Sequence, residues 1–185
     1  MKKLICALTI ALAAVASNAA SLNWSARIAG NDYIGDNMYI IMSTYAPGSW
    51  DNLTATDILN AAKGDRTSTT TEFKGYVDEL TALGSANSQI ALATLDNLPE
   101  SAKSSASAYL VLVTDGKYWV STTAYDVHGY VYSGTESATT WRPQTAAMAL
   151  DSNGTWHNFQ SVPEPTSGLL LLLGVAGLAL KRKRA

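Results

Sequence analysis

The chain has a single cysteine among its 185 residues, and this scarcity excludes several kinds of chemistry. Cys6 lies in an apolar run near the start of the sequence, "LICALTIALAAVA", where it adds only a small apolar side chain. The rest of the chain therefore has no disulfide, no zinc–thiolate site and no cysteine nucleophile. Its stability must come from the packing of its core.

Positive charge is also scarce in the long central part of the chain. Between Ala20 and Val162 there are seven Lys and Arg residues against fourteen Asp and Glu residues, which gives a net charge of −7. A protein that binds nucleic acid needs clustered Lys and Arg side chains to contact the phosphates. Nucleic acid is therefore excluded as a partner.

The sequence lacks the motifs that identify common enzyme classes. It has no G-x-S-x-G elbow, no H-E-x-x-H helix, no phosphate-binding glycine loop and no G-x-G-x-x-G. The two histidines, His128 and His157, could form a two-histidine, one-carboxylate metal site with Asp126. Histidines that hydrogen-bond at strand ends are the favoured interpretation. We therefore expect no catalytic residue, no metal and no cofactor.

Carboxylates occur in close pairs, but their spacing does not predict a site. A glycosidase needs two carboxyl groups that face each other across a cleft. We expect Asp78 and Glu79 on the solvated side of a helix instead. Asp32 and Asp36 are interpreted as turn residues rather than calcium ligands, because the full D-x-[DN]-x-[DN]-G pattern is missing.

Aromatic side chains with a polar atom are far more numerous than phenylalanine. The chain has fourteen Trp and Tyr residues against two Phe residues. Such rings pack well and keep a hydrogen-bonding group. They are common in secreted β proteins without any ligand, but they also stack on sugar rings. A sugar-stacking platform would have to come from Trp24, Trp50, Trp119, Trp141 and Trp156.

The first residues have the features of a secretory signal peptide. Two lysines precede the apolar run, which is short for a membrane span of about 20 residues. The small residues Ser17 and Ala19 follow it. We expect passage through the secretion translocon and cleavage by signal peptidase between Ala19 and Ala20. Residues 1–19 are then the signal, and residues 20–160 are an exported globular domain.

Residues 161–185 combine a Pro-Glu-Pro corner, a short apolar run and a basic cluster. Because proline restricts its own φ and favours an extended residue before it, we expect an exposed, extended corner just outside the bilayer. The 13 residues from 168 to 180 would span about 20 Å as a helix, against a hydrocarbon core of about 30 Å. This is a marginal transmembrane helix, and the basic cluster would hold its end in the cytoplasm.

These three parts, in this order, resemble the PEP-CTERM sorting tails of Gram-negative bacteria. Exosortase, a membrane-embedded, cysteine-type transpeptidase-like enzyme, recognises such tails. The resemblance covers about the last 24 residues. It implies exosortase as a partner, a transient stay in the inner membrane with the domain on the periplasmic side, and then a place at the cell surface or outside the cell. The matching residues are the sorting motif Val162, Pro163, Glu164 and Pro165, and the membrane stop Lys181, Arg182, Lys183 and Arg184.

The body between the two signals favours β-strands. Residues 108–113 and 117–123 are predicted to form a hairpin through Asp115-Gly116, which is typical of a type I′ turn. A second hairpin is predicted from residues 145–150 and 155–159, with a left-handed glycine at Gly154. Further strands are predicted at residues 21–28, 37–45 and 129–134.

Two helices are predicted between the strands. Thr54 and Asp57 have the spacing of a capping box, with Gly64 as the end of that helix. Thr69 and Glu72 would open a second helix that ends at Gly84. Its apolar stripe would be Phe73, Tyr76, Val77, Leu80 and Leu83.

The expected fold is α+β. An antiparallel sheet, with curvature toward a barrel, would carry two short helices, and the transmembrane helix would follow at the end. The alternative is an all-β sandwich.

Two classes of function remain open for this chain. The favoured one is an exported, exosortase-sorted cell-surface or extracellular-matrix protein with a non-catalytic domain. The alternative is a secreted carbohydrate-binding or carbohydrate-degrading module, with extracellular polysaccharide as its partner. The direction in which the five tryptophans point would distinguish the two classes.

Overall fold

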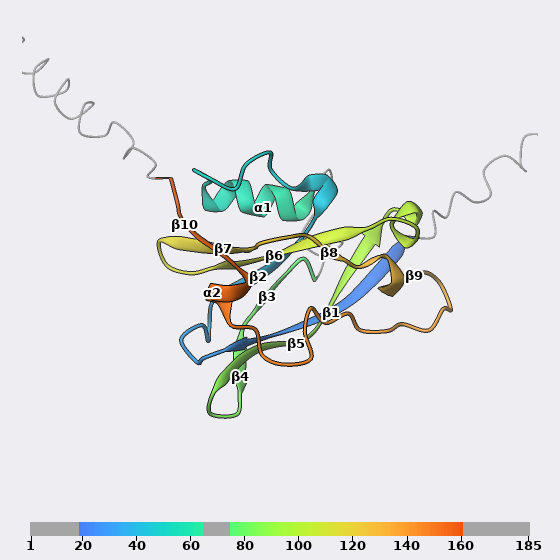
Figure 1. Ribbon diagram of the computed structural model, residues 1–185. Coiled ribbons are helices and arrows are strands. Elements are labelled where there is room, and N and C mark those ends of the chain that lie inside the picture. Colours follow the sequence, from blue (N-terminus) through green and yellow to red (C-terminus); the bar gives the residue numbers. More distant parts are fainter. Residues whose placement is uncertain (1–18, 65–74, 161–185) are drawn as a thin grey trace, which may run out of the picture.

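The computed structural model describes residues 19–64 and 75–160 (Figure 1). The predicted signal sequence up to residue 18, the opening of the predicted second helix and the tail lie outside the described residues. No helix among the residues that are described is long and apolar enough to cross a membrane. The elements are β1 (Ala20–Ala29), β2 (Asn37–Met42), η1 (Ser43–Tyr45), α1 (Ala55–Lys63), β3 (Val77–Glu79), β4 (Thr81–Leu83), β5 (Asn87–Leu98), η2 (Glu100–Lys103), β6 (Ser107–Val113), β7 (Lys117–Ser121), β8 (Tyr125–Asp126), η3 (His128–Tyr130), β9 (Val131–Tyr132), α2 (Leu150–Asn153) and β10 (Gly154–Asn158).

The strands form two open sheets. The larger has the order β10-β7-β6-β2-β3, with β8 also on β6, and the smaller has the order β4-β5-β1-β9. Neighbouring strands pair antiparallel. The mainly antiparallel architecture with few short helices is therefore confirmed. The expected curvature toward a barrel is wrong, because each sheet ends in two edge strands and neither sheet closes.

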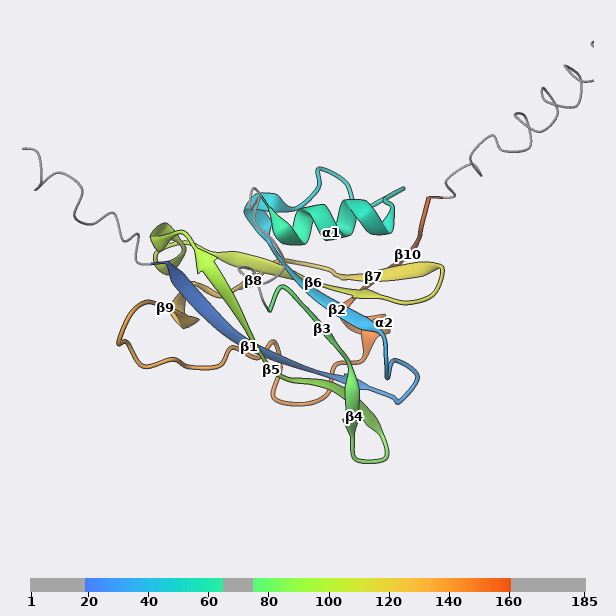
Figure 2. The same cartoon turned by 180° about the vertical axis from the view of Figure 1, so that it is seen from behind.

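The two sheets lie in layers, and α1 covers the outer face of the larger one (Figures 1 and 2). Strand alternation explains the core between the layers. Met38, Ile40 and Met42 of β2 lie opposite Leu112, Leu110 and Ala108 of β6, and all six side chains are buried. On β1 the core side chains are every second residue, namely Ala20, Leu22, Trp24, Ala26 and Ile28.

Helix α1 forms where the capping box predicts it. The Thr54 backbone N–H donates to the Asp57 carboxylate at 2.8 Å, and the Asp57 N–H donates to the Thr54 hydroxyl at 3.2 Å. The helix ends at Gly64, which has a φ of +60°. Ile58 and Ala62 are its buried residues. This prediction is confirmed.

The predicted second helix is wrong over the residues that the structure describes. Residues 77–79 are strand β3, which pairs with Asn37–Tyr39, and residues 81–83 are strand β4. The buried residues of this stretch are Tyr76 and Leu80. A spacing of four residues fits one face of a helix, but it is also a multiple of the strand period of two. The apolar pattern therefore could not distinguish the two structures.

The hairpin at Asp115-Gly116 is confirmed as a connection between β6 and β7, with Val113 opposite Tyr118. The type I′ turn is wrong, because it requires a positive φ at both central residues. Gly116 has a φ of +77°, whereas Asp115 is not among the positive-φ residues. The Thr114 N–H donates to the Lys117 carbonyl at 3.0 Å and closes the loop.

The left-handed backbone at Gly116 should make it the sensitive residue of this hairpin. We expect Gly116→Val to lower the free energy of unfolding by about 1–3 kcal/mol, because a β-branched residue is strained at positive φ. Gly48→Val is the matched control, since Gly48 has no positive φ and no atom within 4 Å of an added Cβ. Urea unfolding of both variants measures the difference, and equal losses would contradict the assignment.

The second predicted hairpin is wrong. Strand β10 pairs with β7 rather than with residues 145–150, and α2, which starts at the last residue of that segment, directly precedes β10. Gly154 has an extended φ of −172° instead of a left-handed one. A Cβ at Gly154 would lie under 3.0 Å from Val120 and the Trp119 ring, so close packing is what requires glycine there.

Candidate functional site

The two histidines do not share a site. His128, in η3, lies with its Nδ1 2.5 Å from the Asp126 carboxylate and is exposed. His157, on β10, lies with its Nδ1 3.1 Å from Asp51, and its ring stacks on Tyr118 with 5.3 Å between the centroids. Each histidine is thus hydrogen-bonded to its own carboxylate, as the favoured interpretation predicts. The part of the chain that the structure describes holds no cluster of three His, Cys, Asp or Glu residues arranged for a metal.

The paired carboxylates serve turns and edges. Asp36 closes the turn between β1 and β2, since its N–H donates to the Tyr33 carbonyl at 3.1 Å and its carbonyl accepts the Leu80 N–H at 2.8 Å. Burial, together with the nearby Asp115, raises the pKa of Asp36. Asp78 and Glu79 are exposed on strand β3, rather than on the helix that the sequence predicts.

Three of the five tryptophans belong to the core. Trp24 and Trp119 are fully buried and Trp141 is 3% exposed. The Trp24 indole N–H donates to the Gly75 carbonyl at 2.6 Å, and that of Trp119 donates to the Leu150 carbonyl at 2.9 Å. The polar atoms of Trp24 and Trp119 are thus used inside the fold, and the burial of all three rings leaves them unable to stack on a ligand.

The other two tryptophans are half-buried, and each packs against another ring. Trp50 meets Tyr109 edge-on with 5.2 Å between the ring centroids. Trp156 stacks on Tyr33 at 6.1 Å, and the Lys117 ammonium lies 4.1 Å from the centre of the Trp156 ring. The five tryptophans therefore do not form one exposed row, and the sugar-stacking platform is not supported.

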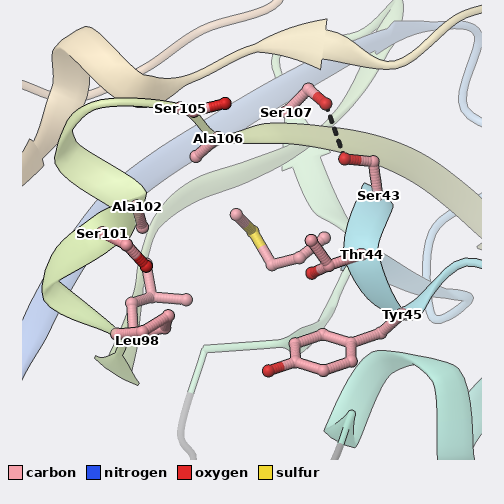
Figure 3. A pocket seen from close by; sticks show the side chains of 11 residues that line it. Ser43, Thr44, Tyr45, Leu98, Ser101, Ala102, Ser105, Ala106 and Ser107 are labelled. Atoms are coloured by element: carbon pink, nitrogen blue, oxygen red, sulfur yellow. Dashed lines mark hydrogen bonds between the residues drawn. The ribbon is translucent and has the colours of Figure 1, made fainter.

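A cavity of about 130 Å³ opens where η1 lies opposite the β5–η2–β6 corner (Figure 3). Hydroxyl groups dominate its polar lining, and none of its lining residues is charged. The Ser43 and Ser107 hydroxyls are hydrogen-bonded to each other at 2.6 Å, and no described histidine or carboxylate hydrogen-bonds to either. Such a lining can hold a neutral polar group, but it supplies no general base. The hydroxyl residues are Ser43, Thr44, Tyr45, Ser101, Ser105 and Ser107.

Sequence reasoning missed this cavity. The available signal was the high serine content of residues 101–107, which hold four serines and lie just before a predicted strand. Serine is common in loops, so this content alone does not indicate a site.

Lys103 ties η2 to the turn that follows β9. Its ammonium lies 2.5 Å from the Glu136 carboxylate and 3.3 Å from that of Glu100. Glu136 also accepts the Ser133 N–H at 2.9 Å. The hydrogen bond from Lys103, then that from Ser133, lowers the pKa of Glu136, and Glu136 in turn raises the pKa of Lys103.

The ion pair between Lys103 and Glu136 should make the stability of the domain depend on pH in the acid range. The pKa of Glu136 is lowered in the fold, so its contribution is present above the unfolded pKa and is lost as the pH falls through the folded pKa. We expect the melting temperature to fall from about pH 5 to about pH 3, and to fall less in Glu136→Gln. Glu79→Gln, which removes an exposed carboxylate without an ion pair to a described residue, should keep the parent slope. Identical slopes of melting temperature against pH in the parent and in Glu136→Gln would contradict a stabilising ion pair between Lys103 and Glu136.

The structure describes both residues that flank the predicted signal-peptidase site. Ala19 is exposed, and Ala20 is the first residue of β1, buried and opposite Leu98. The sorting motif Val162 to Pro165, the apolar run and the membrane stop lie outside the described residues.

Comparison with known proteins identifies the tail. Residues 161–184 match the PEP-CTERM protein-sorting motif. No curated protein and no solved structure is similar enough to this chain to count as a match. The tail of this chain is therefore a PEP-CTERM protein-sorting motif, which supports an exported protein that exosortase sorts.

Proposed function

We propose that this chain is an exported, exosortase-sorted cell-surface or extracellular-matrix protein with a non-catalytic globular domain. The observation that carries the proposal is the match of residues 161–184 to the sorting motif. The domain is residues 20–160, between a cleaved signal sequence and the tail.

The described strands begin where the proposed signal ends. Strand β1 starts at Ala20, directly after the proposed signal-peptidase site between Ala19 and Ala20. Ala20 is buried and pairs with Leu98 of β5. Removal of residues 1–19 after passage through the translocon therefore leaves every described strand complete.

The described elements also end just before the sorting motif. Strand β10 ends at Asn158, and the Phe159 N–H donates to the Gly116 carbonyl at 3.3 Å. The Gln160 N–H then donates to the Leu53 carbonyl at 2.9 Å. Val162 follows two positions later, so processing of the tail can leave the domain intact.

The non-catalytic assignment rests on the polar groups described above. The two histidines bind separate carboxylates, and the Ser43 and Ser107 hydroxyls of the cavity bind each other. The burial of three tryptophans speaks against a sugar-stacking module. A nucleophile, a base and an oxyanion site would have to converge in an acyl-transfer enzyme, and these groups do not.

In this proposal the tail holds the protein in the inner membrane only transiently. The apolar run 168–180 inserts, the basic cluster Lys181 to Arg184 stays in the cytoplasm by the positive-inside rule, and the domain lies on the periplasmic side. Exosortase then processes the tail, and the domain moves to the cell surface or beyond.

Labelling of intact cells tests this function. A membrane-impermeant amine reagent reaches the exposed Lys117 of the domain only when the domain is outside the outer membrane. We expect labelling in a host with exosortase and none in the same host after deletion of the enzyme. Equal labelling in both hosts would contradict the proposal.

A further inference from the structure

Two arginines lie at one hollow between strand β1 of the smaller sheet and the segment 142–145 beside it. The hollow has a volume of about 90 Å³ and is lined by Ser25, Ala26, Arg27, Arg142, Gln144 and Thr145. It is separate from the hydroxyl-lined cavity. Both arginine residues are exposed.

The backbone explains why this hollow exists. Residues 141 and 148 are each clamped to β1, because Ser25 and Trp141 are linked by an N–H···O bond of 2.9 Å and Ala29 and Met148 by one of 2.8 Å. In addition, the Trp141 N–H donates to the Asn23 carbonyl, and the Met148 N–H donates to the Arg27 carbonyl. The bridged partners on β1 are Trp24 and Ile28. The segment from Trp141 to Met148 is longer than the part of β1 from Trp24 to Ile28 that it bridges. Its extra residues loop away from β1 and leave the hollow.

The Arg142 side chain is held in place. Its Nε donates to the hydroxyl of Ser25 at 3.0 Å, and Ser25 is 6% exposed. That bond leaves both terminal amino groups of the guanidinium for another partner. Gln144 on the same loop is fixed through its amide, which donates to Asn153 at 2.6 Å. The Arg142 and Gln144 side of the hollow is therefore held in place before any ligand arrives, which lowers the entropic cost of binding there.

The charges of both arginines are unpaired within the described residues. Neither Arg27 nor Arg142 has a salt bridge there, and the Arg27 side chain makes no hydrogen bond to a described residue. Residues 20 to 162 carry fourteen carboxylates against seven Lys and Arg residues. Two guanidinium groups that share a hollow in so acidic a domain, without a carboxylate partner, leave their charge available to an external anion.

We propose that this hollow binds an oxyanion group, a carboxylate or a phosphate, of a ligand outside the protein. Guanidinium groups match both groups with pairs of parallel hydrogen bonds. The Thr145 hydroxyl and the Gln144 amide line the same space and can add neutral hydrogen bonds. The hollow is large enough for one such group, so the remainder of the ligand extends along the exposed face. This inference concerns the domain and does not depend on how the tail is sorted.

Calorimetric titration of the full chain in a non-ionic detergent tests the inference. The probes are an oligogalacturonate, which carries carboxylates, inorganic phosphate, and a neutral dextran oligosaccharide. Low ionic strength is used because salt screens exposed charges. We expect binding of at least one anionic probe, none of dextran, and weaker binding as salt is added.

Three variants locate the site. Arg27→Gln with Arg142→Gln should weaken anion binding about tenfold or more. Arg27→Gln alone keeps the bond to Ser25 and should show a partial loss if the double variant fails to fold. Lys117→Gln removes the same charge from the ammonium over Trp156 and should bind like the parent.

Each outcome decides the proposal. Binding of oligogalacturonate alone identifies a carboxylated partner, such as an acidic polysaccharide, and binding of phosphate alone identifies a phosphorylated one. Absence of binding by both anions would overturn the proposal. So would equal binding of dextran, or an equal loss in Lys117→Gln and the arginine variants.

Discussion

A chain in which Pro163, Glu164 and Pro165 are all replaced by alanine is expected to accumulate, unprocessed, in the inner membrane. The parent chain should be cleaved and move outward in the same host. The substitutions leave the apolar run 168–180 and the basic cluster unchanged, so insertion should survive. They remove the two fixed φ angles and the single carboxylate between them, which are the features an enzyme could read at the corner.

The control for this variant lies in the same segment. Replacing Thr166 and Ser167 by alanine keeps the corner, the apolar run and the basic cluster, and processing should continue. Fractionation and blotting of parent, triple variant and control measure the outcome. Identical maturation of the triple variant and the parent would mean that the tail acts only as an anchor.

Gly75→Ala is expected to lower the free energy of unfolding more than Gly116→Val or Gly84→Ala does. Gly75 has a φ of +84°, and an added Cβ would lie under 3.0 Å from the Thr94 carbonyl and from the Leu95 nitrogen of β5. The Gly75 carbonyl also accepts the indole N–H of the fully buried Trp24. Alanine must therefore displace backbone at a position where the core hydrogen bond is made. We expect a loss of about 3 kcal/mol or more in the free energy of unfolding.

Gly84→Ala separates the two causes of that loss. Gly84 has a φ of +64°, so it shares the backbone strain, but nothing lies within 4 Å of its added Cβ. Its expected cost is about 1 kcal/mol. Urea unfolding of both variants gives the comparison. Equal losses would show that the contact with β5 is not what requires glycine at position 75.

Local signals in the sequence predicted the elements whose cause is local. The capping box of Thr54 and Asp57 lies within one helical turn, and Asp115-Gly116 joins two strands that are adjacent in the chain. The pairing of β10 is not predicted, because its partner β7 is separated from it in the chain by β8, η3, β9 and α2. Periodicity failed at Tyr76 and Leu80 because a four-residue spacing suits helix and strand alike.

The candidate sites also differ in whether their residues are close together in the sequence. A sorting tail is a linear motif, so Val162 to Pro165 and the basic cluster could be recognised from the letters alone. The arginine hollow could not, because Arg142 and the Ser25 that fixes it are 117 positions apart. Their meeting depends on which backbone groups of residues 141–148 pair with β1, and no local pattern encodes that register.

The intact mass of the chain recovered from outside the cell tests the central claim most directly. We expect a chain that begins at Ala20 and lacks Lys181 to Arg184 when exosortase is present. In a host without the enzyme, the chain should stay with the membranes and keep the basic cluster. Recovery of the chain outside both hosts with Lys181 to Arg184 still attached would contradict it.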